Sequence, residues 1–153
     1  MKFRLLFLAL PAFVTALLSV QLTDRYQTTQ QLEKLKKYKQ ENAIRCSPDW
    51  DALKEMLNEV DIPTIHGAGS YKCKITTASD SEQFYFNQGI NMYYGFHIIE
   101  AMASFKKAEK FDPAAAMIHW AKALAYGPNI NDVGYAASPD ALEAVARANA
   151  LSA

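Results

Sequence analysis

The chain of 153 residues is half hydrophobic, which is enough for the core of one small domain. Its 16 lysine and arginine residues equal its 16 aspartate and glutamate residues, so the overall charge gives no electrostatic reason to bind nucleic acid. The charge is uneven, because residues 24–46 carry six basic residues against three acidic ones. Such a stretch can lie on anionic lipid or form an ordinary solvated helix face.

The N-terminus has the pattern of an export segment. Lys2 and Arg4 precede an uncharged, mainly apolar run from Leu5 to Thr23, which is long enough to span a bilayer. A cleaved signal peptide and an uncleaved transmembrane anchor are both open, and residues 14–16 offer a small-x-small cleavage site. In a bacterial cell, either would place the rest of the chain outside the cytoplasm.

Residues 24–78 are predicted to form a helical spacer and a connecting loop. The polar stretch 24–45 has only a thin apolar stripe, which favours a solvated helix. Residues 47–49, Ser-Pro-Asp, are typical of a helix start, and apolar residues at helical spacing over 50–60 predict one buried face. Residues 63–78 contain glycines and threonines and are interpreted as an ordered loop or a short extended segment.

Two cysteines, Cys46 and Cys73, flank the helix predicted over 50–60. In an exported chain they can form a disulfide, which would stabilise the fold by about 3–4 kcal/mol in the chain-entropy model. Two free thiols are the alternative. The chain has no C-x-x-C motif, so the sequence supports neither a thioredoxin-like redox site nor a c-type haem attachment.

Residues 79–153 show helical periodicity without a clear strand pattern. Ser79 and Glu82 predict a capping box, and Asp112-Pro113 predicts a break, because the residue before a proline avoids the helical conformation. We expect helices over residues 80–94, 98–111, 114–126 and from 138 to the end of the chain.

The stretch 79–113 resembles the tetratricopeptide repeat (TPR), a helix-turn-helix unit of about 34 residues. The residues that carry the resemblance are Tyr85, Gly89, Ala101, Phe105, Ala108 and Pro113. Residues 114–153 repeat the pattern imperfectly, with an insertion in the turn. The resemblance implies an all-α fold of antiparallel helical hairpins, a short α-solenoid, in which Ala101 would face Gly89.

In TPR proteins the first helix of each repeat lines a concave groove that takes an extended peptide or a partner helix. The resemblance places these residues in the groove: Gln83, Phe86, Ile90, Tyr93, Met117, Trp120 and Leu124. The alternative is that this stripe packs as core. Phe86 and Ile90 stand where some members clamp a peptide carboxylate, so that clamp is not implied.

The sequence carries no nucleophile elbow, P-loop, dinucleotide motif or metal-ligand spacing, so we assign no catalytic residue, cofactor or metal. We expect a non-enzymatic, protein- or peptide-binding TPR scaffold of the cell envelope, periplasmic or anchored in the inner membrane. The alternative is an accessory or N-terminal part of an enzyme whose catalytic residues lie on a partner or beyond residue 153.

Besides a protein or peptide partner, we expect self-association through the last helix, around Leu142, Val145 and Ala146, because this alanine-rich segment makes a poor solvating cap. Residues 5–23 would contact the membrane if they are not cleaved, and no nucleic acid is expected. The predicted organisation is an export segment (1–23), a spacer and loop (24–78) and a TPR-like domain (79–153), with repeats at 79–113 and 114–153.

Overall fold

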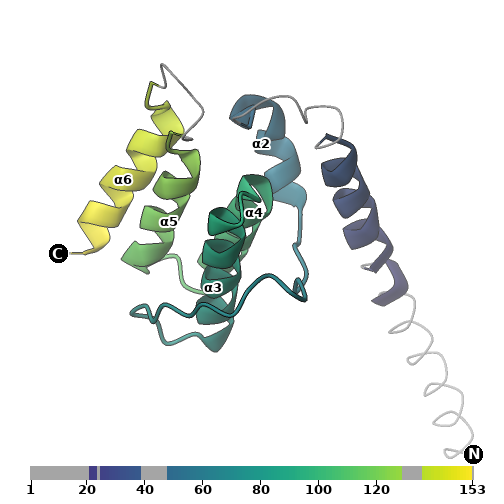
Figure 1. Ribbon diagram of the computed structural model, residues 1–153, viewed down its shortest axis with the longest axis horizontal. Helices are drawn as coiled ribbons and strands as arrows, with labels where there is room; N and C mark the ends of the chain where they lie inside the picture. Colours follow the sequence, from purple (N-terminus) through teal and green to yellow (C-terminus); the bar gives the residue numbers. More distant parts are fainter. Residues whose placement is uncertain (1–20, 24, 39–47, 129–135, 153) are drawn as a thin grey trace, which may run out of the picture.

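The computed structural model describes residues 21–23, 25–38, 48–128 and 136–152. Within these residues the secondary structure is helical with no strand, so the all-α prediction is confirmed. A helix over 25–38 comes first. It is followed by α2 (Trp50–Glu59), α3 (Asp80–Tyr94), α4 (Ile98–Glu109), α5 (Ala116–Tyr126) and α6 (Pro139–Leu151) (Figure 1). Residues 1–20, which hold most of the predicted export segment, and Cys46 lie outside the described residues.

The helices pack mainly against their neighbours in the chain. Helix α3 pairs with α4 across the short turn at residues 95–97, and α5 pairs with α6. Helix α4 lies against α5, α3 also contacts α5, and α2 packs on α4 (Figure 1). The chain therefore forms two helical hairpins side by side, with α2 against the first hairpin.

The core lies between α2, α3, α4 and α5. Its largest fully buried apolar side chains are Leu53, Ile62, Phe86, Met102, Phe105 and Ile118. The rings of Phe86 and Phe105 lie 6.2 Å apart between centroids. Gly89 packs directly on Phe105, and the Phe105 ring, not Ala101, supplies the three atoms nearest to the position a Cβ would take there.

The helix starts agree with the predictions at one end of the chain and differ at the other. Ser138 caps α6 by accepting from the Ala141 N–H, as its sequence context predicts. Asp49, rather than a residue at 47, caps α2 by accepting from the Ala52 N–H. Asp49 is the cap because α2 begins at Trp50, so Asp49 directly precedes the first helical residue.

Only half of the predicted capping box forms at α3. The Ser79 hydroxyl accepts from the Glu82 N–H at 3.2 Å. The Glu82 carboxylate does not reach back to the Ser79 N–H, because the Thr77 hydroxyl lies between them. Thr77 accepts from the Ser79 N–H at 3.0 Å and donates to Glu82 Oε2.

Candidate functional site

A row of side-chain amides on α3 holds the segment that precedes this helix. Gln83, Asn87 and Asn91 follow one another at intervals of four residues, so they lie on one stripe of the helix. We call these three side chains the amide row. The segment they contact, residues 71–75, has neither helix nor strand. We call it the strap, and Figure 1 shows it in the connection between α2 and α3.

The hydrogen bonds between the amide row and the strap join side-chain amides of the row to backbone atoms of the strap. Asn91 Oδ1 accepts from the Tyr71 N–H at 3.1 Å, and Asn91 Nδ2 donates to the Tyr71 carbonyl at 2.8 Å. Asn87 Oδ1 accepts from the Cys73 N–H at 2.9 Å. Gln83 Oε1 accepts from the Ile75 N–H at 3.0 Å, and Gln83 Nε2 donates to the Cys73 carbonyl at 2.8 Å.

The residue spacings of the amide row and of the strap explain which residues pair. Every second strap residue is bound, which is the period of an extended chain whose alternate residues face one side. Two residues of extended chain advance about 6.6 Å, and four residues of α-helix advance about 6 Å. Amides four residues apart can therefore bind alternate residues of an extended chain that runs antiparallel to the helix.

A fourth amide, Gln88, fixes the beginning of the same connection from a buried position. Its Oε1 accepts from the Ile65 N–H at 2.9 Å, and its Nε2 donates to the Pro63 carbonyl at 3.1 Å. The same Nε2 lies 3.1 Å from the hydroxyl of Ser104 on α4. Gln88 occupies the position of the leucine in the TPR pattern, and these bonds satisfy the buried polar group.

Gly69 is required for the close approach of Asn91. A Cβ at residue 69 would lie 2.7 Å from Asn91 Cγ, and the φ of +132° is one that residues with a side chain rarely adopt. Gly67 also has a positive φ, of +80°, but nothing lies within 4 Å of its Cβ position. Gly69, and not Gly67, is therefore needed to leave room for Asn91 of the amide row.

A buried carboxyl group, Glu82, lies at the N-terminal end of α3, with the half-buried Asp112 nearby. Glu82 is fully buried, and burial raises its pKa, with Asp112 nearby raising it further against the opposing effect of the Thr77 hydroxyl. Glu82 Oε1 has no hydrogen-bond partner. The Thr77 hydroxyl also lies 3.4 Å from Asp112 Oδ2, so this residue links the end of the strap connection to the turn before α5.

The groove residues predicted from the TPR resemblance divide into three groups. Phe86 and Ile90 are buried in the core, because they face α4, and they line no open surface. Gln83 belongs to the amide row. Of the remaining four side chains, Tyr93 and Met117 are half-buried and pack against the core, Leu124 is half-buried, and Trp120 is exposed. The sequence-based prediction missed Asn87 and Asn91, whose spacing of four from Gln83 was the available signal.

Most of the residues that carry the repeat pattern lie in the core. Gly89, Ala101, Phe105 and Ala108 are buried. Tyr85 is half-buried, with its ring stacked on Phe111 at 6.0 Å and with Lys107 Nζ 4.5 Å above its centroid. Pro113 is exposed.

The two cysteines and the C-terminal helix also bear on the predicted partners. Cys73 carries a free thiol, and Cys46 lies outside the described residues, so their disulfide stays a prediction. On α6, Leu142 is 59% exposed and Val145 47% exposed. This apolar strip is open to solvent where we expect self-association.

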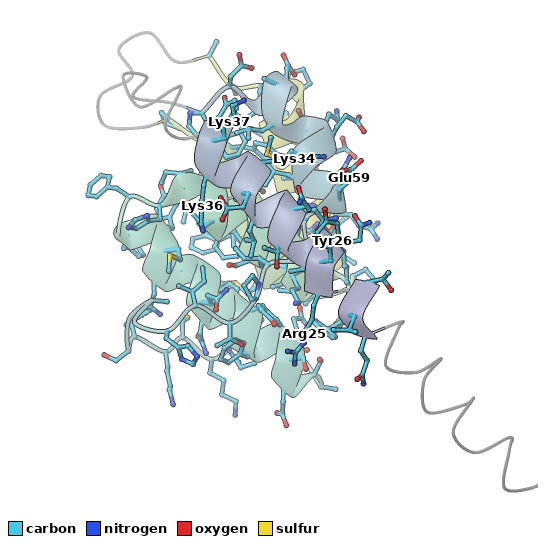
Figure 2. The ribbon with its side chains drawn as sticks, turned by 90° about the vertical axis from the view of Figure 1, so that its right-hand side faces the viewer. Arg25, Tyr26, Lys34, Lys36, Lys37 and Glu59 are labelled. Atoms are coloured by element: carbon cyan, nitrogen blue, oxygen red, sulfur yellow. The ribbon has the colours of Figure 1, made fainter. Side chains whose placement is uncertain are left out.

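The helix over 25–38 carries four exposed basic side chains. Figure 2 labels Arg25, Lys34, Lys36 and Lys37, all of which are exposed. Glu33 forms an ion pair with Lys36 at 2.7 Å and so offsets part of the positive charge of this helix. None of the described helices is long and apolar enough to cross a membrane.

No family model matches the chain, and the searches of curated proteins and of solved structures also find no match. The protein is therefore classified by its own fold and contacts. It is an all-helical protein in which amides of one helix bind the backbone of a neighbouring segment.

Proposed function

We propose that the chain is a non-enzymatic scaffold that binds a protein or peptide, built from two TPR-type helical hairpins. The order of helix packing supports this proposal. Each helix from α3 to α6 lies against the next, and the first helices of the two hairpins, α3 and α5, also touch. Helical repeats bury their apolar faces in this nearest-neighbour manner.

The observation that carries the function is the amide row. A side-chain amide offers one acceptor and two donors, which match the N–H and C=O of a peptide backbone. Asn91 uses both kinds of atom on one residue, Tyr71. This chemistry binds extended chain and has no group that would activate a bond for cleavage or transfer.

The cell envelope is the proposed location. Its support is the sequence alone, namely the two basic residues and the apolar run that follow the start of the chain. In the proposed arrangement the helical hairpins lie outside the cytoplasm. The export segment is either cleaved or serves as an inner-membrane anchor.

A crosslinking experiment tests the function in cells. A photoreactive amino acid is placed at Trp120, which is 43% exposed on α5, and at Tyr94, which is 68% exposed at the end of α3. The control position is Glu55 on the exposed face of α2. We expect a discrete adduct with an envelope protein at one hairpin position and none at the control. Adducts at neither hairpin position would contradict a scaffold function, and partner-dependent turnover would favour the enzyme-accessory alternative.

A further inference from the structure

We propose that the amide row is a binding site for extended peptides, and that the strap occupies it as a built-in ligand that an external peptide displaces. This inference rests on the proposed function and names the class of ligand. The ligand is an extended peptide segment that carries an aliphatic residue at the position of Ile75.

The amide row recognises backbone and not sequence. Five hydrogen bonds join the row to the strap, and each ends on a backbone N–H or C=O. Any extended chain offers the same groups with the same two-residue period. The row is therefore able to bind chains other than the one that fills it.

The side chains of the strap contribute little to holding it in place. Tyr71 is 59% exposed, Lys72 and Lys74 are exposed, and Cys73 is half-buried. Ile75, which is 5% exposed, belongs to the hydrophobic core, and Cys73 packs against that core. An incoming peptide thus has to replace five backbone bonds, the aliphatic contact of Ile75 and the partial packing of Cys73, so its sequence is restricted mainly at the position of Ile75.

The α3–α4 hairpin has packing contacts that do not involve the strap. Helices α3 and α4 pack through Phe86, Gly89 and Phe105, and these contacts lie away from the amide row. Upstream of the strap, Gln88 anchors the connection at Pro63 and Ile65. A strap released from the row would therefore remain tethered while the hairpin stays packed.

Tethering sets the strength of the competition. A segment linked closely to its site acts at an effective concentration on the order of millimolar. The apparent affinity for a free peptide falls by the fraction of molecules in which the row is open. A chain without a competing strap should therefore bind an extended peptide at least about tenfold more tightly than the parent chain.

The direct test replaces residues 70–76 by a Gly-Ser segment of equal length in the full chain. The probe is a fluorescent synthetic peptide with the sequence of residues 70–76 and Cys73→Ser, and binding is followed by anisotropy. We expect saturable binding to the replaced chain and at least about tenfold weaker binding to the parent. A replaced chain that keeps its cooperative melt and does not bind the probe would overturn the proposal. So would a replaced chain that fails to fold, since the proposal requires a fold that survives release.

Variants in the replaced chain locate the site. Asn91→Ala should weaken probe binding by about tenfold, because it removes two backbone contacts. The matched control is Asn149→Ala, an exposed amide on α6, which should leave binding unchanged. A probe with an aspartate at the Ile75 position should not bind, whereas a probe with leucine there should. Equal binding to the Asn91→Ala and parent rows would refute the assignment of the site.

Hydrogen exchange of the parent chain gives an independent readout. The N–H groups of Tyr71, Cys73 and Ile75 should exchange faster than those in the middle of α3, because a displaceable strap opens without global unfolding. Exchange at the same rate as the α3 core would show that the strap is an integral part of the fold. Crosslinking to a partner at Trp120 together with a failed strap test would reject this inference alone and leave the scaffold function standing.

Discussion

Substituting Gly89 by alanine tests the close contact on which the first hairpin depends. A Cβ at this position would lie 2.9 Å from Cζ of Phe105 and closer still to two other ring atoms. Normal carbon–carbon contacts are about 3.5–4.0 Å, so the ring would have to retreat by about 1 Å. Phe105 is fully buried, so its ring would have to move against packed neighbours.

Two opposing effects decide the outcome. Alanine is a better helix former than glycine by about 0.8–1.0 kcal/mol, which favours the variant. Overpacking a buried contact typically costs about 1–3 kcal/mol. Because the nearest ring atom, Cε1, would lie only 2.3 Å from the new Cβ, we place the cost in the upper part of this range, about 2–3 kcal/mol. After the helix gain is subtracted, we expect Gly89→Ala to destabilise the fold by about 1–2 kcal/mol, measured by urea denaturation followed by circular dichroism. For a chain of 153 residues the melting temperature should fall by roughly 2–4 °C per kcal/mol.

A double-mutant cycle separates the steric cost from other effects. Phe105→Leu removes the ring atoms that the new Cβ would meet, so Gly89→Ala should cost less in that background, and the two changes should be non-additive by at least about 0.5 kcal/mol. If Gly89→Ala melted at or above the parent temperature, the close packing of α3 on α4 assigned to these two residues would be incorrect.

Three further predictions follow from other contacts. Burial raises the pKa of Glu82 above its ordinary value of 4.5, so the stability that its protonation contributes is complete below pH 4.5 and is lost as the pH rises through the raised pKa. Glu82→Gln should therefore stabilise the fold at pH 7 and flatten the profile of unfolding free energy above pH 4.5. An unchanged profile would contradict this. Lys107→Met should cost about 1.5–3 kcal/mol, because Lys107 Nζ donates to the Ile62 carbonyl at 2.8 Å in a half-buried site, whereas Lys106→Met should cost clearly less; equal melts would contradict this. If α6 mediates self-association, Leu142→Glu should shift the chain toward the monomer in sedimentation at micromolar concentration, and an unchanged distribution would count against that interface.

The helices of the hairpins could be predicted because their signals are local. The apolar period and the Ser79 cap give α3 its bounds, Asp80–Tyr94, and those are the bounds that the structure shows. Ser138 and the proline after it likewise begin α6. In both helices the cap and the stripe lie within a few residues of each other, so no knowledge of the tertiary fold is needed.

The candidate site could not be predicted in the same way, because it joins residues that are distant in the sequence. Asn91 binds the backbone of Tyr71, 20 residues earlier, and a backbone partner leaves no trace in the residue types. The apolar stripe of α3 was also ambiguous, since periodicity shows which residues share a face and not what covers it. Phe86 therefore fitted a groove and a core equally well, and it lies in the core.

The unequal advance of helix and extended chain limits the length of chain that an amide row can hold in hydrogen-bonding register. Each step along α3 falls behind the extended chain by about 0.6 Å, taking about 6 Å per four helical residues and about 6.6 Å per two extended ones. Side-chain torsions absorb the lag over three amides, but after four or five steps it reaches about 2–3 Å, beyond the tolerance of a hydrogen bond. A single straight helix of this kind can therefore hold a segment of roughly seven residues in register, which corresponds to about three steps. Longer ligands would have to pass to another helix to stay in register.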